Sequence, residues 1–358
     1  MNMEKIRFDN FVSLNRGFDL PDDKIVEGDY PVIASTSIKA YHNQYKIKAP
    51  IVVTGRSGSL GKVQYVEKDG WPLNTSLYAK DFHGNFPKYV YYFLQTMHLE
   101  QFNAGAGVPT LNQNHLHSLK IIVHEKNKQE EIANILSRYD EAIENNNKRI
   151  KLLKQMAQNL YKEWFVRFRF PGWQNAEFEN GIPSIWHQGS LSELLEFKRG
   201  KNITADEMVE GNVPVISAGL EPSGFHIAAN VNGASITVSS SGANAGYLSI
   251  HYEDIWAADC MFISEKKTKN IFYVYELLNN IRPVISNLQR GAAQPHVYSE
   301  DINKLRLYIP DEALMEKANK ILEKFHKEIN QLQKKNQNLA KQRDLLLPRL
   351  MSGKLEVK

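Results

Sequence analysis

The feature of this 358-residue chain that most limits its possible folds is an internal repeat with a period of about 185 residues. The matches recur in the same order in both halves: Asn15–Gly17 with Lys198–Gly200, Tyr30–Ile33 with Val213–Ile216, Trp71–Asn74 with Trp256–Asp259, Gly105–Pro109 with Gly291–Pro295, and Leu119–Val123 with Leu305–Ile309. The offset rises only from 183 to 186 along this series, so the order of the elements is kept. A period this long is not that of a solenoid, and it predicts a duplicated domain.

Composition narrows the class of protein but leaves its function open. Hydrophobic residues make up 42% of the chain and charged residues 23%, which predicts folded domains. No apolar run approaches the roughly 20 residues of a membrane span, and residues 1–9 lack the apolar stretch of a signal peptide. The single cysteine, Cys260, excludes an internal disulfide and is expected to be a small buried hydrophobe. We therefore expect a cytoplasmic protein, whose net charge of +4 permits a nucleic-acid partner without requiring one.

Each half begins with about 120 residues in which short β-type runs alternate with turns rich in Gly, Asn, Ser and Pro. The runs are 51–53, 62–66, 118–124, 235–238 and 305–309. One helix-like stretch interrupts them in each half, Lys88–Phe102 and Asn270–Asn287. The pattern predicts the α+β class, with two similar mixed α/β domains built around twisted sheets.

Each half ends in a helical pattern. Apolar or small residues follow a 4-3 spacing over four heptads, from Leu136 to Trp164 and again from Leu322 to Leu350. This pattern predicts two long helices that pair as a coiled coil, whereas a separate amphipathic surface helix on each domain is the alternative. Pro171 and Gly172 are expected to end the first helix.

The 4-3 pattern also predicts which residues of the two helices face each other. Helices at the ends of two pseudo-twofold repeats should pack antiparallel, and residue pairs whose numbers sum to 482 then join a and d positions at every layer. In this register Asn146 faces Asn336, and Arg343 lies on the ring of Tyr139. A slip of one heptad would place Asn336 against Leu153 or Tyr139, which leaves a buried amide unpaired at a cost of about 1–3 kcal/mol.

These patterns divide the chain into four parts. Residues 1–124 form the first predicted domain and residues 125–168 the first predicted helix. Residues 169–310 form the second domain with its linker, and 311–358 the second helix with a C-terminal tail.

Motifs for catalysis or cofactor binding are missing from the sequence. The glycine-rich stretch Gly55–Lys62 is not a P-loop, because Arg56 stands where the first glycine belongs and Val63 where the magnesium-binding hydroxyl belongs. There is no dinucleotide-binding fingerprint and no Asn-Pro-Pro-Tyr type of tetrapeptide. His115 and His117 suit a weak metal pair less well than they suit a polar strand edge. We predict no catalytic residue, no metal site and no cofactor.

The duplicated domain plus helix resembles the specificity (S) subunit of type I restriction-modification systems. Three regions carry the resemblance. They are Leu160–Val166, then Gly181–Trp186 followed by Leu191 and Lys198–Lys201, and the C-terminal Leu345–Leu355. These are similar to that family's central conserved region, the start of its second target-recognition domain and its C-terminal signature. The chain begins almost at the first repeated element, which predicts a compact variant.

The resemblance implies a non-catalytic subunit that binds double-stranded DNA with two half-sites. It also implies partners: two methyltransferase (M) subunits and, through the complex, restriction (R) subunits. A helix of about 29 residues is roughly 43 Å long, or about twelve base pairs of B-DNA, which suits two half-sites with an unread gap. The alternative function is a duplicated adaptor or scaffold that binds another macromolecule. A fused restriction enzyme is disfavoured by the missing motifs.

The residues expected to contact DNA lie on glycine-rich turns at matching places in the two halves, because base edges and phosphates are bound by donors on such loops. They are Arg56, Ser57, Ser59 and Lys62 in the first half, and Ser239, Ser240, Ser241, Asn244, Arg290, Gln294 and His296 in the second. Arg56 is the best candidate for contacting a guanine. The alternative is that these turns only shape the connections between strands.

Overall fold

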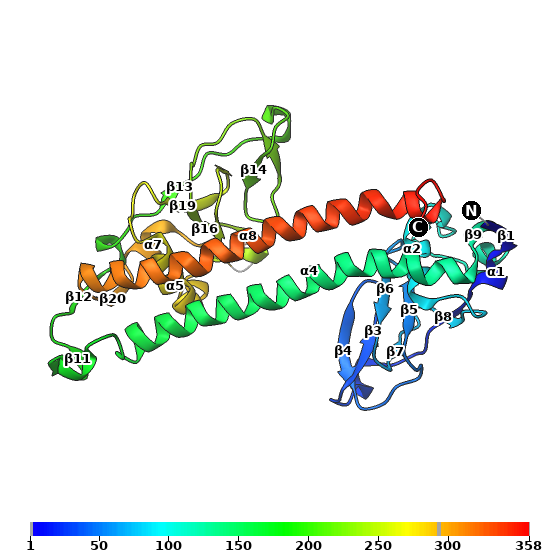
Figure 1. Cartoon of the computed structure of the whole chain (residues 1–358). Helices are drawn as coiled ribbons and strands as arrows, with labels where there is room; N and C mark the ends of the chain where they lie inside the picture. Colours follow the sequence, from blue (N-terminus) through cyan, green and yellow to red (C-terminus); the bar gives the residue numbers. More distant parts are fainter. Residues whose placement is uncertain (1–2, 292–294, 358) are drawn as a thin grey trace. The chain divides into compact units, whose positions relative to one another are not determined.

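The computed structural model describes residues 3–291 and 295–357, in which two compact units are distinguished. Unit 1 comprises residues 1–145 and 335–358, and unit 2 comprises residues 146–334. Figure 1 shows the two long helices, α4 (Lys126–Tyr161) and α8 (Glu312–Met351). Both helices cross the boundary between the units, so each unit contains part of each helix.

Unit 1 contains three small sheets. Its strands are β1 (Met3–Arg7), β2 (Ser13–Arg16), β3 (Tyr30–Ile33), β4 (Ile38–His42), β5 (Ile51–Gly55), β6 (Val63–Val66), β7 (Trp71–Pro72), β8 (Ser76–Asp81) and β9 (Lys120–His124). They form a four-stranded sheet in the order β2-β8-β5-β6, a three-stranded sheet β4-β3-β7 and the pair β1-β9. Only β3 and β7 run parallel.

Unit 2 repeats this topology strand for strand. Its strands are β12 (His187–Ser190), β13 (Lys198–Arg199), β14 (Val213–Ile216), β15 (Gly224–His226), β16 (Ser235–Ser239), β17 (Leu248–His251), β18 (Trp256–Ala257), β19 (Cys260–Ser264) and β20 (Arg306–Ile309), after a short hairpin of β10 (Phe178–Glu179) and β11 (Ile182–Pro183). The sheets are β13-β19-β16-β17, β15-β14-β18 and β12-β20, with β14 and β18 parallel. The prediction of two similar mixed α/β domains is confirmed.

The shorter helices depart from the sequence prediction at two places. The expected helix over 88–102 is α2 (Pro87–Thr96) followed by a 3-10 turn over Leu99–Phe102, because His98 between them adopts a left-handed φ of 48°. The expected helix over 270–287 is α5 (Ile271–Asn280) and α6 (Arg282–Asn287). It breaks at Ile281, and Pro283 in the first turn of α6 has no N–H to continue the ladder of α5.

His115 and His117 lie in a short helix, α3 (Gln113–His117), and not at the start of a strand, so that prediction is wrong. The Asn112 side chain accepts a hydrogen bond from the Asn114 N–H and starts this helix. The ring of His117 serves the fold, since its Nε2 accepts the Leu14 N–H at 3.0 Å.

The long helices are 36 and 40 residues long. Each begins about ten residues before the first residue of the predicted 4-3 pattern. α4 ends earlier than predicted: a π-helical turn covers Lys162–Val166, well before Pro171. This turn allows both Trp164 and Phe165 to be buried, with Phe165 4.9 Å from Tyr273 between ring centroids. Burial of two adjacent aromatic side chains therefore ends the helix, and Pro171 does not.

Within each unit, the core joins a sheet, one domain helix and the two long helices. In unit 1, Leu77 and Tyr89 share a core with Leu136 of α4 and Leu350 of α8. The His124 Nε2 also lies 2.8 Å from the Leu350 carbonyl oxygen. In unit 2, Ile236 and Leu277 share a core with Ala157 and Leu322, and a further cluster contains Ile150, Ile329 and Leu332.

Within each unit the two long-helix segments run in opposite directions. In unit 1, His124 just before α4 meets Leu350 and the later Asp140 meets the earlier Arg343. In unit 2, Ile150 clusters with Ile329 and Leu332, whereas the later Ala157 shares a core with the earlier Leu322. Arg343 forms an ion pair with Asp140, a partner that the sequence analysis did not anticipate. Cys260 is 1% exposed, as expected for a small buried hydrophobe. The pairing of Asn146 with Asn336 stays a prediction.

Candidate nucleic-acid interface

The first predicted loop joins β5 to β6 in unit 1 and is tightly closed. Gly58 and Gly61 adopt left-handed φ angles of 85° and 88°, which favour glycine. A Cβ at Gly55 would lie 1.9 Å from the Ser59 carbonyl oxygen, so only glycine allows this approach. The N–H groups of Arg56 and Ser57 both donate to the Thr75 carbonyl oxygen, at 2.8 and 3.1 Å. The loop is thus held by backbone contacts that leave its side chains available for other partners.

A second segment of unit 1 meets this loop about 50 residues later in the chain. The Gly58 N–H donates to the Pro109 carbonyl oxygen at 2.9 Å, and the Leu111 N–H donates to the Arg56 carbonyl oxygen at 2.8 Å. The turn Gly105–Pro109 is a repeated element of the sequence but was not among the residues predicted to contact DNA. The only signal available was its equivalence to the turn that carries Arg290 and His296.

Unit 2 builds the same arrangement from its own loop. The Gly242 N–H donates to the Pro295 carbonyl oxygen at 3.0 Å, and the Val297 N–H donates to the Ser240 carbonyl oxygen at 3.0 Å. Gly242 has a φ of 76°, as Gly58 has in unit 1. The structure therefore brings together the two segments of the second half that the sequence analysis had selected separately. The predicted contact residue Gln294 lies outside the described residues.

The predicted side chains of unit 1 differ in exposure. Ser59 and Lys62 are exposed, while Arg56 and Ser57 are half-buried. The Arg56 Nη1 lies 3.5 Å from the Asn74 carbonyl oxygen, a distance at the outer limit for a hydrogen bond. The guanidinium therefore retains most of its donors for another partner.

Two predicted side chains of unit 2 have roles inside the loop. Ser239 and Ser241 are buried, and the Ser239 hydroxyl donates to the Ala218 carbonyl oxygen at 3.1 Å. The Ser241 hydroxyl donates to Asp259 Oδ2 at 2.7 Å. These contacts give both hydroxyls a part in shaping the loop. Ser240 and Asn244 are half-buried on the same turn.

Arg290 and His296 gather around an exposed tyrosine that the sequence analysis missed. The Arg290 guanidinium pairs with Asp301 (Nη2 to Oδ1, 2.6 Å) and lies 5.9 Å from the ring centroid of Tyr298. His296 stacks on the same ring at 6.3 Å. Tyr298 is 51% exposed, so this cluster presents a cation, an imidazole and a phenol at the surface beside the loop.

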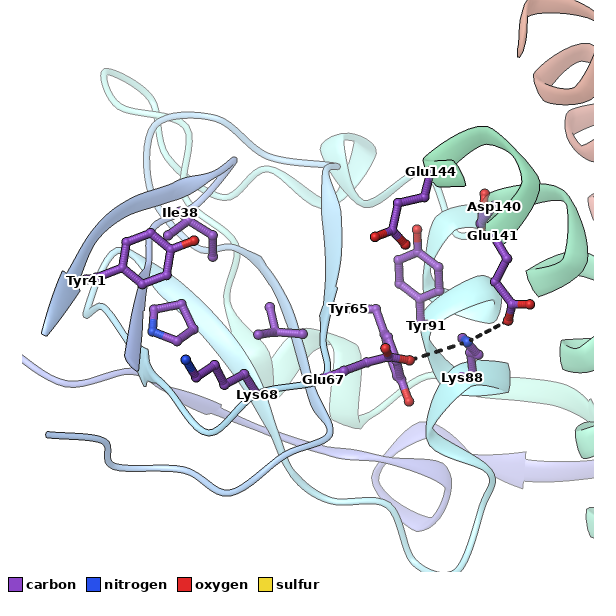
Figure 2. A pocket seen from close by; sticks show the side chains of 12 residues that line it. Ile38, Tyr41, Tyr65, Glu67, Lys68, Lys88, Tyr91, Asp140, Glu141 and Glu144 are labelled. Carbon is purple, nitrogen blue, oxygen red and sulfur yellow. Dashed lines mark hydrogen bonds and ion pairs between the residues drawn. The ribbon is translucent and has the colours of Figure 1, made fainter. Parts of the chain in front are cut away.

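A hollow of about 700 Å³ in unit 1 is lined by more acidic than basic side chains, unlike the predicted DNA-contact loops (Figure 2). Lys88 there lies between two carboxylates, with its Nζ 3.5 Å from Glu67 Oε1 and 3.6 Å from Glu141 Oε1. Asp140 and Glu144 line the same hollow. Four carboxylates against two lysines repel phosphate, so this hollow does not suit a DNA backbone.

The described part of the chain holds no group of three His, Cys, Asp or Glu residues arranged to bind a metal ion. Nor does any helix among residues 3–291 and 295–357 have the length and apolarity to cross a membrane.

A family model described as the type I restriction modification DNA specificity domain matches residues 2–155 and again residues 183–341. The chain belongs to this family. The two matched regions follow the duplication, with one in each half. The loops described above, 55–62 and 239–244, therefore lie at equivalent places in two copies of a DNA specificity domain.

Two curated relatives are similar to this family member along most of its length, each at 25% identity. One is the specificity subunit of the type I restriction enzyme MjaIX of Methanocaldococcus jannaschii, matched over 87% of this chain and 78% of the relative. The other is a putative type I specificity subunit of Mycoplasma genitalium, matched over 99% and 95%. A crystal structure of a type I S subunit from M. genitalium shares the fold, with a TM-score of 0.65, 21% identity and coverage of 100% and 97%.

Proposed function

We propose that the two halves of this specificity subunit each recognise one half of a split sequence in double-stranded DNA. The observation that carries the proposal is the repeated surface: in both units a glycine-rich loop after the central strand is bonded to a Gly-Ala-x-x-Pro turn. The loop sequences differ, with Arg56 at the place of Ser240, so the two surfaces offer different donors. In this proposal the recognition domains are residues 1–124 and 169–310, and the segments that contain the long helices α4 and α8 are residues 125–168 and 311–358.

The chemistry belongs to partners in this proposal. Two methyltransferase subunits and, through them, restriction subunits are directed to the site that this chain binds, in the cytoplasm and without a cofactor on this chain. An adaptor function is not favoured, because both halves match a DNA specificity domain. Base-resolution mapping of methyladenine tests the proposal in cells that express the chain with its methyltransferase. One bipartite sequence should be methylated and should disappear when the chain is deleted; a motif that persists would contradict the proposal.

Arg56→Ala is expected to weaken specific DNA binding by about 1–3 kcal/mol and to relax one position of one half-site, because a bidentate arginine–guanine contact is lost. Titration of labelled duplexes that differ at each base measures both effects. Arg56→Lys separates the two kinds of contact: a lysine keeps a phosphate contact but cannot replace the planar fork on a base. Arg16→Ala is the control, since exposed Arg16 pairs with Asp19 at 3.6 Å. Unchanged affinity in Arg56→Ala would leave Arg56 a purely structural residue.

We also propose that Asn146 and Asn336 pair and set the register of the long helices. Asn146→Leu should lower the free energy of unfolding by about 1–3 kcal/mol, because it leaves the Asn336 amide without its partner. The double replacement Asn146→Leu with Asn336→Leu should recover most of this loss. Asn147→Leu is the matched control, at an exposed position beside the seam. Chemical denaturation measures these three variants against the wild-type chain, and a double variant that recovers none of the stability lost in Asn146→Leu would show that the two amides do not interact.

A further inference from the structure

A small pocket in unit 2 is lined by a glutamate, Glu276, one of whose carboxylate oxygens is buried without a hydrogen-bond partner among the described residues. The pocket has a volume of about 230 Å³ and is lined by Gln158, Tyr161, Lys162, Glu276, Asn279, Asn280 and Pro283. Glu276 is only 3% exposed. Its Oε1 lies 3.3 Å from His326 Nε2, while its Oε2 is buried without a hydrogen bond from any described residue. Such an oxygen costs free energy unless a donor reaches it.

The equivalent position in unit 1 indicates which kind of hydrogen-bond donor suits the Glu276 oxygen. α2 and α5 share the pattern Tyr-Val-Tyr, and the residue after it is Tyr92 in unit 1 and Glu276 in unit 2. Tyr92 donates its hydroxyl to Asp140, which stands 186 residues before His326. Both units therefore join the domain helix to a long helix through one polar pair at equivalent positions.

Unit 1 adds a third member that unit 2 lacks. The Arg343 guanidinium forms ion pairs with both Asp140 and Asp344. The residues 186 positions earlier are Ala157 and Gln158, and Gln158 lines the pocket. Where unit 1 supplies its own guanidinium, unit 2 has the buried methyl group of Ala157, and the next residue, Gln158, lines the pocket together with Glu276.

We propose that this pocket binds the guanidinium group of an arginine side chain from a partner polypeptide. A volume of about 230 Å³ is below the roughly 300–1,000 Å³ of sites for whole small molecules and suits one side-chain head. A guanidinium has five donors in one plane, for the Glu276 Oε2 and the amide oxygens of Asn279 and Asn280. The ring of Tyr161 adds an aromatic wall. Lys162 also lines the pocket, and its exposed, flexible side chain competes with the arginine for the same space.

The test uses the full chain without DNA, so its result does not depend on the proposed function. The probes are the capped peptide acetyl-Ala-Arg-Ala-amide, its lysine counterpart and agmatine, followed by saturation-transfer NMR. The arginine peptide should bind with a Kd on the order of 1–10 mM, as expected for one side-chain head. The lysine peptide should bind several-fold more weakly.

Glu276→Gln removes the charge but keeps the size of the side chain, and it should weaken the arginine peptide by about tenfold or more. Gln158→Arg changes an exposed residue, so the chain should fold, and its guanidinium should fill the pocket and block the peptide. Lys162→Met should leave binding unchanged or make it tighter. Unchanged binding in Glu276→Gln and Gln158→Arg, or no binding to the wild-type chain, would overturn the proposal and leave a water site. Much tighter binding of agmatine than of the peptide would assign the pocket to a free cation instead.

Discussion

Replacing residues 180–310 with the same region of a relative that recognises another sequence is expected to change one half of the methylated sequence and leave the other half unchanged. The reason is that the loop–turn surface of unit 2, residues 239–244 with Arg290 and residues 295–297, lies wholly inside the exchanged region. The surface of unit 1 lies wholly outside it. Base-resolution methyladenine mapping measures the result, and the reciprocal exchange of residues 1–124 is the matched control.

The boundaries of this exchange keep the pair β12-β20 whole but divide the β10-β11 hairpin, in which Phe178 pairs with Pro183. Both strands of the pair β12-β20 are exchanged together, so their register is kept. Several contacts cross the boundary: Glu276 and the Tyr252 hydroxyl both meet His326, and the Asn319 Oδ1 accepts the N–H groups of Phe272 and Tyr273 at 3.0 and 3.1 Å. A donor segment that keeps Glu276 is therefore the best choice. If both halves of the sequence change, or neither does, the two units do not read DNA independently.

His326→Leu is expected to destabilise unit 2 by about 3–5 kcal/mol, because it leaves a buried carboxylate without its partner. The side chains of His326 and Glu276 are 2% and 3% exposed. The His326 Nδ1 lies 2.9 Å from the Tyr252 hydroxyl, and its ring stacks on Phe272 at 5.0 Å. With the imidazole gone, neither oxygen of Glu276 has a hydrogen-bond partner among the described residues.

The double variant Glu276→Leu with His326→Leu separates loss of the pair from loss of packing. Two apolar side chains of similar size remove both buried polar groups, so most of the stability should return, apart from the Tyr252 hydroxyl that lost its partner. Hydrogen exchange of the α5 amides measures the effect within unit 2 without requiring two-state unfolding of the whole chain. A double variant as unstable as His326→Leu would show that packing, and not the buried charge, makes His326 necessary.

Several features of the fold followed from the sequence because they repeat along the chain. The matches at offsets of 183–186 predicted two similar domains, since equal patterns of apolar residues and turns bury equal faces, but they did not predict the strand order within each domain. The 4-3 spacing predicted the long helices for the same reason. Where the pattern was short, as at His115 and His117, the local structure was mistaken, because five residues have no measurable period.

Other features exist only in the tertiary structure. The contact of Gly58 with Pro109 joins segments about 50 residues apart, and the sequence of neither segment indicates that it contacts the other. The buried pair Glu276–His326 spans 50 residues in the same way. A sequence determines which side chains are apolar and at what spacing, so it determines elements and their repetition. Which polar groups meet depends on distances between elements that only the packed chain sets, and the candidate DNA surfaces and the guanidinium pocket both belong to that class.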